Sequence, residues 1–484
     1  MGLLGTGVGL GIWGDVLFYG RSLGLNVLLW ALAFVAALGF LLRLSQAPLH
    51  QGRRWMLLPL LLFSVAFLWH DSPLLVATNL LALAGAVALA ALRRTAPDVV
   101  RTAPGDYVAG LVAAGASTLA GSVQLLHKDV EWDEVARSLR REKTLTLGRG
   151  LALAAPLVAL FGGLFMSADP VFRNLITAAV PPLEHPLGQM AVILAVAWLA
   201  AGLLRDLLAS REEARLLSPT AVRDSLPPLS LAPTEVAITL GALNALFFAF
   251  VLVQLRYLFG GRDLVEAHAH LTYAQYARHG FFELLAVSAL VLLVLLAADS
   301  LLRKKGERSQ TVVRLLSAGL VALVFVVMAS ALQRMRLYEQ AYGLTELRLY
   351  AVGVILWLGV VFIWFSLTML GGRRNLFATG AVIAGFAATA ALNVANPDAL
   401  IARTNVDRPR IDIAYVGGLS DDAVPALLEA LPSLRPDVRR TIAAELLRRS
   451  EKSGDWRSLN VARSRASSLL RAHHGELVQF AKMG

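Results

Sequence analysis

Runs of about 20 apolar residues recur along the chain and restrict its possible folds more than any other feature of the sequence. A helix needs about 20 mostly apolar residues to cross a hydrocarbon core of roughly 30 Å. Of the 484 residues, 57% are hydrophobic and only 16% are charged, whereas soluble domains carry about 25% charged residues. The sequence therefore predicts an all-α fold, namely a polytopic transmembrane helical bundle.

Ten segments meet this test of length and composition, so we expect about 10 spans in a transmembrane bundle that covers residues 23–395. The predicted spans are residues 23–42, 55–69, 73–92, 149–166, 186–204, 234–257, 280–301, 312–333, 349–370 and 376–394. Residues 1–22 are expected to form an N-terminal segment that precedes the first span.

The segment 106–126 is rich in small residues and is expected not to cross the membrane. Its small residues recur at helical spacing, which favours a re-entrant or protein-buried helix. The following stretch, 128–143, is expected either to lie in the lipid interface or to form a solvated loop. The residues expected to contact the lipid interface are Trp132, Arg137, Arg140, Arg141 and Lys143.

The distribution of Lys and Arg predicts which loops face the cytoplasm. If 106–126 does not cross, one set of loops carries 23 Lys and Arg residues and the opposite set carries eight. Short loops rich in these residues stay on the cytoplasmic side. We therefore expect a multi-pass protein of the cell (inner) membrane with both termini outside the cytoplasm.

The composition changes after the last predicted span. Residues 401–484 hold 14 Lys and Arg and 10 Asp and Glu, without an apolar run long enough to cross a membrane. We expect a linker over 396–410 and a small helical C-terminal domain over 411–484. Ser420 and Asp455 are expected to cap helices, and Pro436 suits a first helical position.

Several short stretches, taken together and in order, carry a resemblance to a known family. They are Gly14 to Gly20, Ser167 to Phe172, Tyr273 to Arg278, Gly280 to Leu284, Tyr342 to Thr345, Asn396 to Asp398 and Asp455 to Ser458. The chain resembles a bacterial family of multi-pass membrane proteins known only as a domain of unknown function. This resemblance implies a bacterial cell-membrane location and a helical tail, and it brings no reaction or ligand.

The motifs of common enzyme chemistry are absent from the sequence. The chain has no cysteine, which excludes thiol catalysis and Cys-ligated zinc. It also lacks the His-Glu-x-x-His, Walker A and Gly-x-Ser-x-Gly patterns. We predict no cofactor, and the net charge of +11 is spread over loops and tail rather than forming a surface for nucleic acid.

Polar residues near the predicted outer ends of the seventh and eighth spans form the main candidate site. They are Glu283, Arg334, Arg336, Glu339, Tyr276 and Tyr338. Ionisable groups beside spans usually face the bundle interior or a water-filled cavity, so this set predicts an outward-facing ligand pocket. The alternative is a structural ion pair between Glu283 and an arginine, with the tyrosines in the interfacial aromatic belt.

Other polar residues are weaker candidates. Glu266 and His270 have helical spacing and are the better pair for a metal site, although no metal is predicted. The loop residues His70, Asp71, Asn396 and Asp398 add polar groups to the same outer face. Within or near spans, helix-to-helix hydrogen bonds or local ion pairs are expected for Asn79, Asn244, Gln254 and Asp299.

These patterns favour a non-enzymatic envelope protein that acts as an organiser, sensor or complex subunit with an extracytoplasmic docking domain. Its expected partners are membrane lipids and, through the C-terminal domain, other envelope proteins. An alternative is a transporter or lipid-handling protein with a pocket around Glu283. A third is a membrane-embedded transferase acting on lipid-linked substrates, which needs acidic residues converging on one cavity.

Overall fold

The computed structural model describes residues 2–44, 51–95, 184–208, 232–259, 281–302, 307–406, 408, 412–449 and 455–482. Within these ranges the chain is helical and has no strands, which confirms the predicted all-α class. Six of the helices are long and apolar enough to cross a membrane. They include residues Leu25–Leu44, Gly188–Arg205, Pro233–Leu252, Gln310–Tyr342, Glu346–Leu370 and Arg374–Ala395.

Helices occupy nine of the ten predicted spans. They are α2 (Leu25–Leu44), α3 (Gln51–Trp69), α4 (Pro73–Thr95), α9 (Glu184–Leu208), α12 (Pro233–Phe259), α15 (Phe281–Leu301), α16 (Glu307–Tyr342), α17 (Glu346–Phe365, extended by a π turn, Ser366–Leu370) and α18 (Phe377–Ala395). The remaining predicted span, 149–166, and the segments 106–126 and 128–143 lie outside the described residues.

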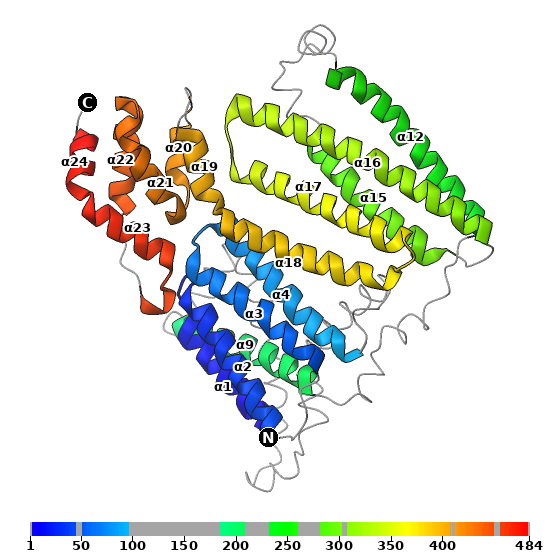
Figure 1. The fold of residues 1–484 in the computed structure, drawn as a ribbon. Coiled ribbons are helices and arrows are strands. Elements are labelled where there is room, and N and C mark those ends of the chain that lie inside the picture. Colours follow the sequence, from blue (N-terminus) through cyan, green and yellow to red (C-terminus); the bar gives the residue numbers. More distant parts are fainter. Residues whose placement is uncertain are drawn as a thin grey trace.

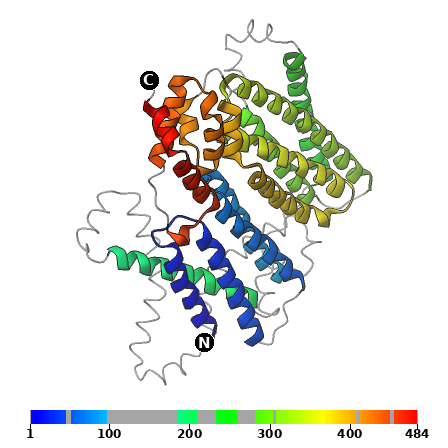
Figure 2. The same ribbon diagram turned by 60° about the vertical axis from the view of Figure 1, so that its left-hand side comes forward.

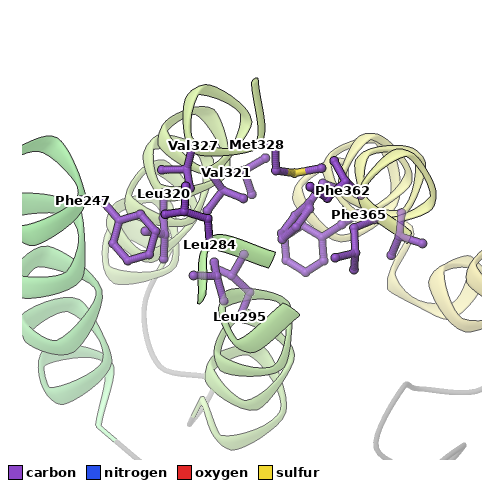
Figure 3. Close-up of a cluster of buried hydrophobic side chains, with 14 of the residues drawn as sticks. Phe247, Leu284, Leu295, Leu320, Val321, Val327, Met328, Phe362 and Phe365 are labelled. Atoms are coloured by element: carbon purple, nitrogen blue, oxygen red, sulfur yellow. The ribbon is translucent and has the colours of Figure 1, made fainter. Parts of the chain in front are cut away.

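The bundle helices form two groups with separate cores (Figure 1). One core joins α12, α15, α16 and α17, which contribute Phe247, Leu295, Leu320 and Phe362 to a single cluster of buried side chains (Figure 3). The other joins α1 (Gly2–Phe18), α2 and α9. Helix α18 packs against α17 of the first group and against α4, and α4 in turn contacts α9 of the second group. Helices α18 and α4 therefore connect the two groups.

Polar side chains link neighbouring helices inside the bundle, as the sequence predicts. Asn79 on α4 and Asn393 on α18 exchange two side-chain hydrogen bonds of 3.0 and 2.8 Å. Asn244 on α12 donates to the Leu316 carbonyl of α16. Asp299 forms an ion pair with Arg374 at 3.0 Å, whereas the sequence suggested nearer basic residues. The side chain of Gln254 lies outside the described part.

The N-terminal helix α1 is a feature that the sequence interpretation missed. Three glycines on one face of α1, at positions 7, 11 and 14, pack directly onto α9. A Cβ atom at Gly11 would lie 2.5 Å from the Ile193 carbonyl oxygen. Because only glycine permits this approach, Gly7, Gly11 and Gly14 form a helix-packing surface on α1.

The direction of α1 alters the expected placement of the N-terminus. A Cβ atom at Gly2 would lie within 4 Å of Leu41 and Leu44, at the far end of α2. The opposite end of α2 meets the C-terminal helices, since Leu25 N–H donates to the Leu459 carbonyl at 2.8 Å. The two termini therefore lie at opposite ends of the α1–α2 hairpin (Figure 1), whereas the sequence predicted both on one side.

The C-terminal domain is helical and has its own core (Figure 2). Its helices are α19 (Pro397–Val406), α20 (Ile413–Gly418), α21 (Val424–Ala430), α22 (Pro436–Arg449), α23 (Val461–Ala472) and α24 (His474–Lys482), with short 3-10 turns between several of them. Residues expected to form a linker make up α19, whose Ile401 and Ala402 are completely buried in this core. The domain therefore begins at the end of α18 without an extended tether.

Candidate functional site

Within the described residues, a cluster of buried polar side chains lies where the C-terminal domain meets the turn between α3 and α4. Five residues define it, and we call them the junction cluster: His70, Asp71 and Ser72 of the turn, and Asp398 and Asp422 of the domain. All but Asp71 are buried, and Asp398 has no exposed surface. Buried carboxylates are rare unless they are paired, so their partners decide what this region can do.

Asp422 bonds the domain to the turn through both carboxylate oxygens. Its Oδ1 lies 2.7 Å from Nδ1 of His70, which donates when the imidazole carries a proton there. Its Oδ2 accepts the backbone N–H groups of Asp71 at 2.6 Å and of Ser72 at 3.1 Å. Hydrogen bonds to an ionised acceptor are about twice as strong as neutral ones, so this carboxylate is a strong link.

Asp398 makes the second link between the same elements. Its Oδ1 accepts the Ser72 hydroxyl at 3.2 Å, and its Oδ2 accepts the Ser420 N–H at 3.0 Å. Asp398 lies in the first turn of α19, where an acidic residue is favoured by the helix dipole. The preceding Asn396 adopts a left-handed conformation with φ 48°, which ends α18 and starts α19 directly.

Further contacts hold α23 against the same turn. Asn460, the N-cap of α23, donates to the carbonyls of Phe67 and His70 at 2.9 and 2.7 Å. Arg463 forms an ion pair with Asp71 at 3.1 Å and also donates to Ser22 and to the Leu23 carbonyl. The domain is thus fixed to two separate turns of the bundle.

Asp71 is the junction residue with a perturbed acidity. Burial raises the pKa of its carboxyl to about 6, against the pull of Arg463. The nearby charges of Asp421 and Asp422 contribute to this raised pKa. Asp71 therefore changes charge close to neutral pH, where an exposed aspartate is fully ionised.

An open cleft of about 810 Å³ lies beside the cluster. Its lining includes Asp71, Glu346, Tyr415, Arg448 and Arg463. Tyr415 accepts the Glu346 N–H at the start of α17 with a distance of 2.7 Å, and burial raises the pKa of this phenol. The cleft thus combines acidic and basic groups from both parts of the protein.

The buried acids of this region hold the C-terminal domain against the bundle. In the part of the chain that the structure describes, no group of three or more His, Asp or Glu residues is placed to hold a metal ion. Both oxygens of Asp398 and of Asp422 accept hydrogen bonds from the protein. They therefore fix the position of the domain on the bundle.

The structure places four of the predicted site residues at the C-terminal end of α16, which extends nine residues beyond the predicted span. The Tyr338 ring lies 4.0 Å below the guanidinium of Arg348 and 5.1 Å from the Tyr342 ring. Arg408 donates to the backbone carbonyl of Glu339 at 2.7 Å. Arg334 and Arg336 lie one turn earlier, and Arg334 also has an interaction partner.

The other predicted site residues cannot be placed in this way. Glu283 lies in the first turn of α15, but its side chain is outside the described part. Tyr276, the metal candidates Glu266 and His270, and the interfacial residues Trp132, Arg137, Arg140, Arg141 and Lys143 lie outside the described residues. The pocket around Glu283 therefore stays a prediction.

Sequence reasoning missed the role of Asp422, although it identified the neighbouring helix cap. Ser420 accepts the Asp422 N–H and caps the 3-10 turn Asp421–Ala423, as expected. That interpretation treated Asp422 as an acidic residue of a first turn. The signal for its role was the equally polar turn at His70 to Ser72, but nothing in the sequence paired two segments about 350 residues apart.

A family model described as a domain of unknown function (DUF4153) matches residues 57–430. The chain belongs to this family. The DUF4153 region includes the whole junction cluster, most of α3, and the helices α4, α9 and α12 to α21, whereas α1, α2 and α22 to α24 lie beyond it. No curated protein and no solved structure matches the chain. The structure and the family together describe a polytopic membrane protein of unknown function.

Proposed function

We propose that this DUF4153 protein acts in the cell envelope as a non-enzymatic sensor or complex subunit, with its C-terminal domain held rigidly outside the cytoplasm. The observation that supports this most directly is the use of the buried acids. Asp398 and Asp422 accept hydrogen bonds at both carboxylate oxygens from the α3–α4 turn and from Ser420, and Asp398 also interacts with the Glu346 carboxyl. A transferase that relies on acidic residues needs carboxylates free to reach substrate.

The rigid connection gives the domain a way to affect the bundle. The domain contacts three turns of the bundle: the α1–α2 turn through Leu459, the α3–α4 turn through Asp422, and the α16–α17 turn through Asn405. The Asn405 side chain accepts the Leu344 N–H at 2.9 Å and donates to the Leu344 carbonyl at 2.6 Å. Gly343 permits that last turn through its φ of 84°. A partner that shifts the domain therefore shifts three inter-helix turns together.

The experiment compares complexes extracted with mild detergent from cells that make the full chain or a variant. We expect a stoichiometric envelope partner that is lost in Asp422→Ala, because the domain is no longer held in place. The matched control is Asp437→Asn, an exposed acid on α22 that pairs with Arg435 at 3.3 Å. A protein that extracts alone, or a partner that stays bound equally to Asp422→Ala, would contradict the proposal.

The side of the membrane is tested separately with reporter fusions. The excess of Lys and Arg in the opposite loops supports an extracytoplasmic C-terminal domain. Because α1 runs antiparallel to α2, Gly2 then lies on the cytoplasmic side. A reporter active only outside the cytoplasm should work at the C-terminus and fail at the N-terminus, and the reverse pattern would refute this orientation.

A further inference from the structure

A second cleft, of about 710 Å³, lies between α23 and the turn that joins α1 to α2. Four arginines and five serines contribute to its lining, and we call it the arginine–serine cleft. Ser464, Ser467 and Arg471 project from α23, while Arg21 belongs to the α1–α2 turn. Such a combination of guanidinium and hydroxyl donors suits an anionic group rich in oxygen acceptors.

The charges that line the arginine–serine cleft leave a positive excess. Only two carboxylates face it, against four arginines. Asp455 is already bound by Arg21 at 3.0 Å and by Arg457 at 2.8 Å, and those bonds lower its pKa to about 2. Asp421 lies 3.6 Å from Arg449. Arg463 pairs with Asp71, and Arg449 also pairs with Glu445, so the positive charge left for an incoming anion is that of Arg471.

Arg471 is the arginine best placed to accept a ligand. Its Nε donates to the Ser467 carbonyl one turn earlier on α23, at 3.2 Å. Among the described residues, its two terminal nitrogens have no protein partner. Because Arg471 is exposed and contacts only its own helix, it contributes a donor pair to the cleft without holding the domain to the bundle.

The location of the cleft points to the membrane surface. The 3-10 turn Trp456–Ser458 lies against the end of α1, where Arg457 donates to the Val16 carbonyl at 2.7 Å. Trp13 and Val16 on α1 are exposed apolar residues, as expected for a face in contact with lipid. Trp456 is 61% exposed at the rim of the cleft, and tryptophan is enriched where lipid meets water.

We propose that the arginine–serine cleft binds the phosphate group of an anionic phospholipid headgroup, with Trp456 inserted into the interfacial layer beside it. Arginine binds phosphate through paired N–H donors, and the serine hydroxyls supply further hydrogen bonds. The inference rests on the proposed function and deepens it, because it names the class of molecule that the domain contacts at the membrane surface.

The test uses the full chain purified in detergent. It is titrated with phosphatidylglycerol or with phosphatidylcholine, and bound lipid is counted by native mass spectrometry. We expect a clear preference for phosphatidylglycerol. Arg471→Gln should weaken its binding roughly fivefold, since one basic residue near anionic lipid contributes about 1 kcal/mol. The double variant Ser464→Ala with Ser467→Ala should also weaken it, whereas Arg435→Gln, which lies outside the cleft, should not.

Added inorganic phosphate separates the two sources of the ligand. Phosphatidylglycerol that stays bound in millimolar phosphate supports a lipid headgroup, whereas displacement assigns the cleft to free phosphate and overturns the lipid assignment. Equal binding of both lipids, or no effect of the cleft variants, would overturn the proposal as a whole. Because detergent titration does not depend on orientation, a cytoplasmic C-terminal reporter would refute the proposed sidedness and leave this result intact.

Discussion

Removing the Asp422 carboxylate is the most direct way to test how the C-terminal domain is held. Asp422→Ala leaves three donors without their acceptor: His70 Nδ1 and the N–H groups of Asp71 and Ser72. A buried donor that loses its partner costs about 1–3 kcal/mol, so three of them amount to roughly 4 kcal/mol after partial relaxation. Asp422→Asn keeps an acceptor oxygen but loses the charge, which costs about 2 kcal/mol.

Hydrogen exchange at the α3–α4 turn measures this cost directly, because Asp71 and Ser72 N–H groups are themselves bonded to Asp422. A loss of 4 kcal/mol corresponds to about a thousandfold lower protection, and 2 kcal/mol to about thirtyfold. The measurement is mass spectrometry of peptides that contain residues 70–73, from full-length protein in detergent.

The exposed control Asp437→Asn should leave the protection of the same peptides unchanged. Unaltered protection at residues 71 and 72 in Asp422→Ala would refute the clamp. So would an equal loss of protection in the buried core of α16 and α17, since that result indicates global unfolding instead of local release.

Three further predictions address other parts of the protein. Gly11→Leu should destabilise the protein by about 1–3 kcal/mol, because a Cβ at this position meets the α9 backbone. The control Gly9→Leu has open space around it and should not destabilise the protein. Thermal unfolding in detergent distinguishes the two variants, and equal midpoints would contradict the packing of α1 on α9. Because the pKa of Asp71 is raised, its contribution to stability is present below about pH 4 and is lost as pH rises through about 6. The free energy of unfolding of the wild type should therefore fall by up to about 3 kcal/mol over this range, and that of Asp71→Asn should not. Parallel pH profiles of stability for the two proteins would rule this out. Glu283→Gln should lower the thermal midpoint if this residue forms the predicted structural ion pair, whereas a stable variant with lost ligand binding would favour the pocket.

The positions of the bundle helices could be predicted because apolar length alone determines them. The helices α2 and α18 begin and end within a few residues of the predicted limits. The polar links at Asn79 and Asn244 were also predictable, since an amide inside an apolar helix requires a partner on another helix. The predicted start of α22 at Pro436 is confirmed.

Other features depend on information that local sequence does not contain. Helix α1 was missed because its 17 residues are short for a span and glycine is a poor helix former; packing on α9 overrides that propensity. Asp455 was expected to cap a helix, and it caps the 3-10 turn Trp456–Ser458. The N-cap of the following helix α23 is Asn460, because the chain turns twice within five residues. The junction cluster depends on tertiary contacts and has no local pattern.

The long separation between His70 and Asp422 has a consequence for biosynthesis. The two residues are 352 positions apart, so at about 5–20 residues per second the ribosome needs tens of seconds to supply the acceptor for a turn that is already made. The α3–α4 turn therefore gains its partners in the C-terminal domain only late in synthesis, Asp398 and Asp422 first and Asn460 and Arg463 after them.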